Sequence, residues 1–259
     1  MLRLARRAFR RFFPRRLHPL LDATGVDVAR DAEFEAAYRA TISADDAFTT
    51  NRYREGVRWR HVVEHYLPDE RRARVLDVGG GNGAIELAFD ASPRFVAASV
   101  EQLVNRDAME SHRRADTPLR RSLADAAALP FRTASIDVVL LLETIEHLRE
   151  PMHVGAEIAR VTRDGGVLLI TTPLRWRYAF SPDPHFGIRG LVLLPPSLQR
   201  AVAARRGYTE VDHYVDRIYA SATQVARCFP DFDVVEILSR SRAPRAWFWD
   251  ALVLRRRAR

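Results

Sequence analysis

The stretch VLDVGGGNG at residues 75–83 decides the fold class of this 259-residue chain. An apolar strand runs directly into a glycine-rich turn, and the residues after the turn fit the start of a helix. Glycine is needed because such a turn requires positive φ and because a side chain would keep a ligand away from the backbone. In open α/β sheets, turns of this kind lie at the carboxyl ends of the strands, where ligands bind.

Alternating strands and helices continue on both sides of this turn. The alternation predicts parallel strands joined by crossover helices, in a Rossmann-like, doubly wound α/β domain of three α/β/α layers. Strands 74–78 and 138–142 are continuously apolar, as expected when helices cover both faces of a sheet. We expect strands at 74–78, 95–101, 119–123, 136–142, 166–171, 232–238 and 247–254, and helices at 83–91, 103–112, 150–162 and 220–228.

The composition is that of a globular protein without disulfides. Hydrophobic residues make up 47% of the chain and charged residues 29%, which suffices for a sizeable core. Cys228 is the single cysteine, so no internal disulfide forms and a reducing compartment fits. No apolar run nears the roughly 20 residues that span a bilayer, and arginines interrupt the N-terminal stretch where a signal peptide would lie. We therefore expect a cytoplasmic protein. The chain contains arginine but no lysine and is rich in alanine, which indicates a GC-rich bacterial genome.

The positive charge is concentrated at the two ends of the chain. Residues 1–17 hold seven arginines and 255–259 hold four, so removing these eleven from the net +8 leaves −3 for residues 18–254. Residues 1–18 form a basic amphipathic helix, with arginines on one side, phenylalanines on the other, and Pro14 ending the run. This helix either lies on an anionic membrane surface or packs its aromatic face on the protein's own core. Residues 19–72 read as a polar helical extension, with helices at 33–40 and 53–66.

The glycine turn is compatible with two kinds of nucleotide ligand. Gly79, Gly81 and Ala84 satisfy the looser form of the nicotinamide-dinucleotide fingerprint. Asp77 argues against a dinucleotide, because a carboxylate beside the turn would repel a pyrophosphate. S-adenosylmethionine carries sulfonium and ammonium charges and no phosphate, so Asp77 suits it. A glycine-rich turn without any ligand is the third interpretation.

Several motifs together resemble the class I S-adenosylmethionine-dependent methyltransferases, of the type 11 or ubiquinone-biosynthesis kind. DVGGGNG at 77–83 resembles their first motif, and ADAAALPF at 124–131 resembles their D-A-x-x-L-P-F stretch. SIDVV, ETIEHL, RDGG and TTP follow in the family's order and approximate spacing, so the resemblance covers roughly residues 55–254. It implies a seven-stranded, mostly parallel sheet in a domain at 73–259, with an antiparallel last strand at 247–254. It also implies that 173–219, an irregular stretch here, is an insertion covering the acceptor.

The resemblance also implies which residues hold the cofactor. Gly79, Gly81 and Gly83 would pass under the methionine part, with Asp77 near its ammonium group. Glu101, at the end of strand 95–101, would hold the ribose hydroxyls; its alternative is a solvated acid at a strand end. For Asp125 the adenine amine is the implied partner, and a turn-capping carboxylate is the alternative. The remaining implied contacts are the Ala126 amide beside the adenine and Leu142 on the sulfonium side.

Glu143, Glu146 and His147 are the candidates for catalysis. If a helical turn begins at Glu143, the three side chains share one face beside the methyl donor. His147 could then act as general base, because histidine ordinarily titrates near neutrality, with Glu146 beside it. Glu-x-x-Glu-His also resembles the magnesium motif of ubiquinone-biosynthesis O-methyltransferases and small-RNA methyltransferases, in which case the trio would bind Mg²⁺ with His213 as a further ligand. Simple capping and pairing is the third option.

The predicted function is therefore transfer of a methyl group from S-adenosylmethionine to an oxygen of a small molecule, lipid or glycan precursor. The aromatic and apolar residues of 173–219, together with the basic N-terminal helix, favour an acceptor at the inner membrane face, with peripheral contact to anionic lipid. Nucleic acid is disfavoured because residues 18–254 are slightly acidic and phosphate binding needs clustered positive charge. The alternatives are an RNA 2′-O-methyltransferase and a binding module without catalysis.

Overall fold

A seven-stranded sheet forms the centre of the protein. The computed structural model describes residues 47–67, 72–102, 109, 112–113, 116–183, 186–208, 218–239 and 249–258. The strands lie in the order β3-β2-β1-β4-β5-β7-β6. β7 pairs antiparallel with both β5 and β6, and the other pairs are parallel. The predicted fold class is confirmed. The strands are β1 (Ala73–Val78), β2 (Phe95–Glu101), β3 (Arg121–Leu123), β4 (Ile136–Leu142), β5 (Thr162–Thr171), β6 (Phe232–Leu238) and β7 (Ala251–Arg256).

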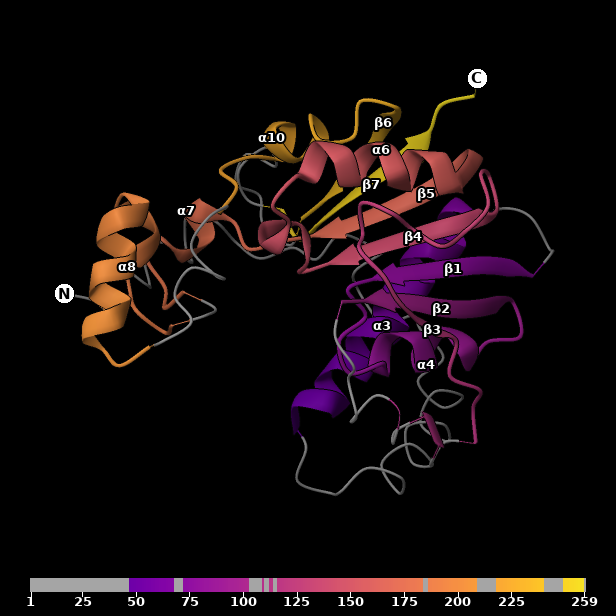
Figure 1. Ribbon diagram of the computed structural model, residues 1–259, viewed down its shortest axis with the longest axis horizontal. Coiled ribbons are helices and arrows are strands. Elements are labelled where there is room, and N and C mark those ends of the chain that lie inside the picture. The colour runs from indigo at the N-terminus through magenta and orange to yellow at the C-terminus, as the bar shows by residue number, and fades with distance from the viewer. Residues whose placement is uncertain are drawn as a thin grey trace.

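Two layers of helices cover the sheet, one on each face (Figure 1). Helices α3 (Ala47–Tyr66) and α4 (Ala84–Asp90) lie on one face, and α6 (Pro151–Val161) and α10 (Ala222–Ala226) lie on the other. Successive residues of a strand point to opposite faces, so β4 sends Val139 to the α6 side and Val138 to the α3 side. All seven β4 residues are buried. Continuous apolar sequence is therefore the mark of a strand covered on both faces, as predicted.

Helix α3 begins six residues earlier than the predicted helix 53–66 and packs closely on α4. A Cβ atom at Gly56 would lie 2.7 Å from the Cβ of Ala88, so the two backbones approach more closely than side chains allow. Tyr53, one turn before Gly56, is buried in a cluster with Ala84, the first residue of α4. The start of α3 is thereby held beside the end of the glycine turn.

Residues 174–208 project from the carboxyl edge of the sheet (Figure 1). The sequence predicts an irregular segment, but it contains the short helix α7 (Arg175–Tyr178), the 3-10 helix η4 (Leu191–Leu193) and helix α8 (Pro196–Arg205). Prolines do not exclude a helix here, because Pro195 and Pro196 stand at the start of α8, where proline fits the first turn. The projecting residues 174–208 have a small apolar core of their own, which contains Phe186, Leu191 and Ala203.

Several predictions fall partly or wholly outside the described residues. The predicted strand 247–254 is β7, which begins four residues later, and its first two predicted residues are not described. None of the helices that the structure describes combines the length and apolarity needed to cross a membrane. Outside the described residues lie the helices predicted at 1–18 and 33–40, most of the helix predicted at 103–112, and His213.

Candidate functional site

The three glycines of the turn have positive φ for different reasons. φ is 82° at Gly79, 57° at Gly81 and 80° at Gly83. A Cβ at Gly79 would lie 2.6 Å from the hydroxyl oxygen of Thr144, and one at Gly83 would lie 2.9 Å from Nε2 of His112. At Gly81 a Cβ would meet nothing within 4 Å. Gly79 and Gly83 are thus required by packing, whereas Gly81 faces open space that a ligand could occupy.

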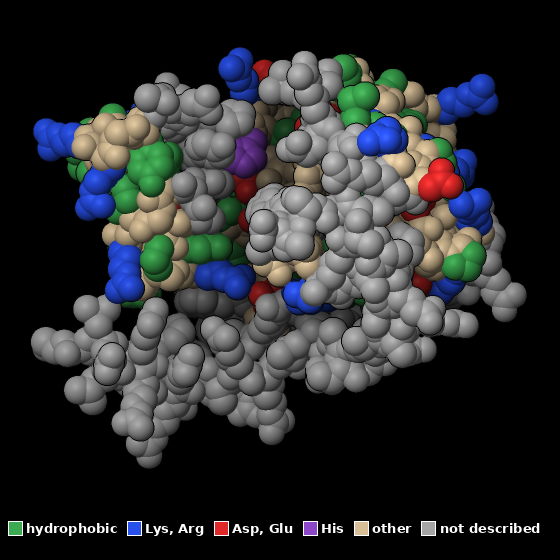
Figure 2. Space-filling view, turned by 90° about the horizontal axis from the view of Figure 1, so that it is seen from below, with side chains coloured by type: hydrophobic (Ala, Val, Ile, Leu, Met, Phe, Trp, Pro, Cys, Tyr) green, Lys and Arg blue, Asp and Glu red, His purple; other side chains and the backbone are tan. Residues whose placement is uncertain are grey.

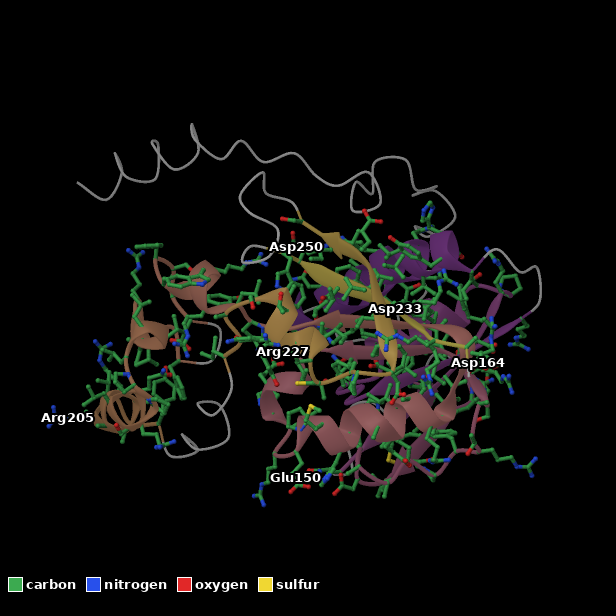
Figure 3. The ribbon with its side chains drawn as sticks, turned by 90° about the horizontal axis from the view of Figure 1, so that it is seen from above. Glu150, Asp164, Arg205, Arg227, Asp233 and Asp250 are labelled. Atoms are coloured by element: carbon green, nitrogen blue, oxygen red, sulfur yellow. The ribbon has the colours of Figure 1, made fainter. Side chains whose placement is uncertain are left out.

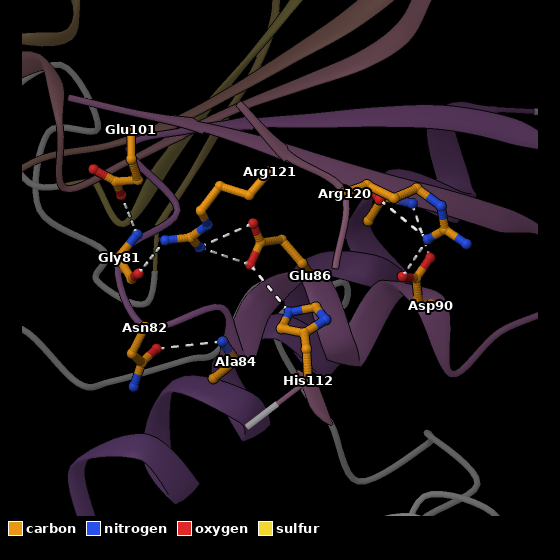
Figure 4. Close-up of polar contacts among 10 residues, drawn as sticks. Gly81, Asn82, Ala84, Glu86, Asp90, Glu101, His112, Arg120 and Arg121 are labelled. Carbon is orange, nitrogen blue, oxygen red and sulfur yellow. Dashed lines mark hydrogen bonds and ion pairs between the residues drawn. The ribbon is translucent and has the colours of Figure 1, made fainter. Parts of the chain in front are cut away.

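Polar side chains from β2, β3 and α4 hold the glycine turn in place (Figure 4). The Gly81 N–H donates to Glu101, and the Gly81 carbonyl accepts from Nη1 of Arg121 at 2.8 Å. Nη2 of Arg121 donates to both carboxylate oxygens of Glu86, at 3.2 Å each. Nε2 of His112 lies 3.7 Å from the same carboxylate. Arg121 therefore links strand β3 to the glycine turn and to the first turn of α4.

Asp77 is buried at the head of the turn, and neither of its carboxylate oxygens has a hydrogen-bond partner among the described residues. Burial, and next the neighbouring Glu86, raise the pKa of Asp77 to about 8, while Arg52 of α3 acts in the opposite direction. A buried carboxylate without a partner is costly. The position therefore favours a cationic ligand group, and it disfavours a phosphate.

Replacing Asp77 by asparagine tests this burial. Because its pKa in the folded protein lies above the ordinary value near 4, Asp77 stabilises the ligand-free fold at low pH, and this contribution is lost as pH rises through about 8. We expect Asp77→Asn to match the wild type in thermal stability near pH 5 and to exceed it by several degrees at pH 9. Differential scanning fluorimetry across this range measures the difference, with the exposed Asp164→Asn as control. Greater destabilisation of Asp77→Asn at pH 9 than at pH 5 would contradict the assignment.

The residues predicted to hold the nucleoside lie at adjacent strand ends. Gly79 N–H donates to the Val100 carbonyl at 2.9 Å, and Ala124 N–H donates to the Glu101 carbonyl at 2.9 Å. The predicted adenine residue Asp125 therefore follows directly on the residue bonded to Glu101. Its Oδ1 accepts from the Ala127 N–H at 2.8 Å, which is the turn-capping role given as its alternative. A carboxylate has further lone pairs, so the contact with adenine stays a prediction.

The other two predicted cofactor contacts, Ala126 and Leu142, are buried, unlike Asp125. Ala126 is buried, while Asp125 beside it is exposed. Leu142 ends β4 and packs in the apolar cluster on the α3 side of the sheet. The contact of Leu142 with the sulfonium side of the cofactor stays a prediction.

The segment after β4 does not bring Glu143, Glu146 and His147 onto one helical face. Glu143 has a left-handed backbone, with φ 54°, and the 3-10 helix η3 (Ile145–His147) begins two residues later. The expectation of a helical turn starting at Glu143 was wrong because Glu143 N–H instead bonds to the Thr171 carbonyl on β5. Among the residues that the structure describes, no group of three His, Cys, Asp or Glu side chains is placed to hold a metal ion. The Mg²⁺ interpretation of this trio is not supported.

Glu146 and His147 remain next to each other. Glu146 is buried, and its Oε2 accepts from the Thr172 hydroxyl at 3.0 Å. Its Oε1 lies 4.0 Å from Nε2 of His147, whose side chain is 24% exposed. Burial, and next the charge of Glu143, raise the pKa of Glu146 to about 8. The imidazole of His147 is thus partly exposed to solvent, whereas the carboxyl group of Glu146 is buried next to it.

Glu143 lies close enough to Glu146 for its charge to raise the pKa of that residue. Its side chain is exposed, yet protein surrounds it closely enough for desolvation to raise its pKa, a combination expected on the floor of a hollow. Figure 2 shows such a hollow near the middle of one face, with acidic and histidine side chains at its edge.

Sequence reasoning missed the residues that support the turn. Glu86 follows the pattern of a surface acid in the first turn of a helix, and Arg121 is one of many arginines in its segment. Arg52 lies in the polar helical extension and acts on Asp77 and Glu143 through its charge. No spacing in the sequence distinguishes these residues, because each reaches the site from a different element.

Residues 76–170 match a family described as a methyltransferase domain. The chain is 36% identical over 103 residues to an uncharacterized methyltransferase of Mycobacteroides abscessus, covering 39% of this chain and 40% of that protein. It is 32% identical over 148 residues to one of Mycolicibacterium vanbaalenii, covering 56% and 57%. It is 36% identical over 108 residues to 27-O-demethylrifamycin SV methyltransferase of Amycolatopsis mediterranei, covering 40% of each. The matches thus span less than two thirds of these relatives.

Solved structures share the fold at low sequence identity. A putative S-adenosylmethionine-dependent methyltransferase from Listeria monocytogenes has a TM-score of 0.54 at 13% identity, covering 79% of this chain and all of that one. The geranyl diphosphate C-methyltransferase of Streptomyces coelicolor has a TM-score of 0.53 at 13% identity, covering 76% and 75%. These likenesses confirm the architecture.

Proposed function

We propose, from the premise that residues 76–170 form a class I S-adenosylmethionine-dependent methyltransferase domain, that this chain methylates an oxygen of a small molecule, lipid or glycan precursor. The observation that carries the proposal is the pairing of two residues at the turn: no described residue occupies the place of a Cβ at Gly81, and the buried carboxyl group of Asp77 has no hydrogen-bond partner among the described residues. Together they suit a cationic nucleoside without phosphate. The residues fit S-adenosylmethionine better than a dinucleotide.

In this proposal the protein supplies positioning and one proton acceptor. S-adenosylmethionine, when bound, supplies an already activated methyl group. The imidazole of His147 takes the proton of the acceptor hydroxyl as the oxygen forms its bond to the methyl carbon and the carbon–sulfur bond breaks. Glu146 stands behind the imidazole and, when ionised, stabilises its protonated form. Alignment of the acceptor with the methyl group supplies the rest of the acceleration.

The acceptor would be covered by the projecting residues 174–208. This part exposes four large apolar side chains, and its helix α8 carries Arg200 and Arg205. Apolar and cationic groups together suit an acceptor with a hydrocarbon part and an anionic part, such as a lipid or a glycan precursor at the inner membrane face. Peripheral contact of the basic helix at 1–18 with anionic lipid belongs to the same proposal. The apolar side chains are Trp176, Phe180, Leu193 and Leu198.

Two relatives support a small-molecule acceptor by their names. The Amycolatopsis mediterranei relative is named for methylation at an oxygen of rifamycin, and the Streptomyces coelicolor structure is named for methylation of geranyl diphosphate.

Calorimetry and a transfer assay test the function together. We expect S-adenosylhomocysteine to bind the wild-type protein, NAD to show no binding, and labelled methyl from S-adenosylmethionine to enter a metabolite of a bacterial extract. Activity should persist in excess EDTA, because the proposed chemistry uses no metal ligand. Binding without transfer to any extract would indicate a binding module, and transfer to RNA alone would indicate an RNA methyltransferase. Binding of NAD in place of S-adenosylhomocysteine would overturn the proposal.

A further inference from the structure

Side chains hold the two peptide groups that flank Gly81. Its N–H donates to Glu101 from β2, and its carbonyl accepts from Arg121 on β3. The two contacts come from adjacent parallel strands, whose register places Ser99 opposite Arg121 and Glu101 opposite Leu123. Because φ at Gly81 is positive and the space in front of it is open, this backbone conformation gets no support from a packed side chain of its own. The two polar contacts supply that support.

Arg121 is itself held in one orientation. Its side chain is 5% exposed and that of Glu86 is 3% exposed, and the guanidinium contacts both oxygens of this carboxylate. Both oxygens accept from Nη2 alone, so this buried contact anchors one end of the guanidinium. The remaining Nη1 is thereby aimed at the Gly81 carbonyl (Figure 4). Glu86 thus supports Arg121, and Arg121 supports the turn.

We propose that Arg121 is a positioning residue of the cofactor site, which together with Glu101 holds the backbone on both sides of Gly81 in the conformation that accepts the nucleoside. This inference rests on the proposed function. A carboxylate has about four acceptor positions, so Glu101 can retain the Gly81 N–H while it accepts from the ribose hydroxyls. Arg121 touches the protein only, and it acts on the cofactor through Gly81 and Glu101.

Arg121 also balances the acidic charge around the turn. Asp77, Glu86 and Glu101 influence one another through their charges. Burial raises the pKa of Glu101, whereas the Gly81 N–H and the Arg121 charge lower it. An ionised Glu101 only accepts hydrogen bonds, which is what two ribose hydroxyls require. Without Arg121, Glu101 would more easily take up a proton and lose one acceptor position.

The preceding residue provides a matched control. Arg120 also pairs with an acid of α4, donating to Asp90 at 2.8 Å, and it contacts the Ala97 carbonyl at 3.4 Å. Among the described residues, Arg120 makes no contact with the glycine turn, and Figure 4 shows it reaching α4 at a different place from Arg121. Both arginines join the same strand region to the same helix. Only Arg121 should therefore affect cofactor binding beyond its effect on stability.

The experiment compares Arg121→Met with Arg120→Met in the full chain, with S-adenosylhomocysteine as the titrant in calorimetry. Residues that hold the ligands of a metal in place typically contribute 10- to 100-fold to metal affinity. By analogy, we expect Arg121→Met to raise the Kd for S-adenosylhomocysteine by about that order. Arg120→Met should lower thermal stability by a similar amount and leave Kd unchanged. In turnover, Arg121→Met should raise KM for S-adenosylmethionine and leave kcat at saturation near the wild-type value.

The outcomes separate this inference from the proposed function. If the wild type binds no S-adenosylhomocysteine, the proposed function fails. If the wild type binds and Arg121→Met binds equally well, or if Arg120→Met loses as much affinity, only the positioning role fails. Should Arg121→Met not fold, Arg121→Lys decides, because lysine keeps the charge but cannot contact Glu86 and Gly81 in the same way. Wild-type affinity in Arg121→Lys would then overturn the proposal, and a weaker affinity would support it.

Discussion

Gly81→Val should abolish binding of S-adenosylmethionine and S-adenosylhomocysteine while the protein stays folded. A Cβ at this position meets no protein atom within 4 Å, so valine does not collide with the ligand-free protein. Its side chain instead fills the space proposed for the cofactor. The positive φ adds a backbone cost of about 1–2 kcal/mol for a residue with a Cβ. Calorimetry should show Kd raised beyond the measurable range, and circular dichroism should show an unchanged spectrum.

Gly165→Val is the matched control for this variant. Gly165 also has positive φ, at 72°, and a Cβ there also meets nothing within 4 Å. It lies near the start of β5, and Figure 3 places its neighbour Asp164 far from Arg205 of the projecting part. Both valines should cost similar stability, but only Gly81→Val should lose the cofactor. Retained affinity in Gly81→Val would mean that the ligand binds elsewhere.

His147→Ala should lower kcat by about 10²- to 10⁴-fold, the usual contribution of a positioned proton acceptor. The Kd for S-adenosylhomocysteine should stay at the wild-type value, because His147 is not one of the proposed cofactor contacts, whose polar members lie at the ends of β1, β2 and β3. Glu146→Gln keeps an acceptor for the Thr172 hydroxyl and removes the charge beside the imidazole. We therefore expect Glu146→Gln to reduce kcat less than His147→Ala does. Steady-state kinetics on the acceptor found in the extract assay measures both.

His153→Ala is the control for the histidine variant. His153 also pairs with a glutamate, with its Nδ1 2.7 Å from Glu150, but its side chain is 74% exposed on α6. Its replacement should leave kcat unchanged. If His147→Ala were as active as His153→Ala, the proton would be accepted by another group and His147 would have a structural role only.

The sequence predicted most of the elements near the site closely, because their signals are local. Strand 136–142 is found at its predicted residues, and strand 95–101 likewise. The apolar pattern of a doubly covered strand and the glycines of a positive-φ turn are both read from consecutive residues. The prediction failed where the chain has a local alternative. A helical turn at Glu143 is consistent with the residue types, and the hydrogen bond to β5 that replaces it is not visible in the sequence.

The sequence by itself determined the fold class, the place of the glycine turn and the presence of an acid at its head. Only the tertiary structure decided that Gly81 faces open space while Gly79 and Gly83 are required by packing. It also decided that Arg121 supports the turn. The physical reason is that periodicity and backbone preference act between near neighbours in the chain. Contacts such as that of Arg121 with Gly81, 40 residues apart, depend on strand order, register and side-chain reach, which exist only in the folded protein.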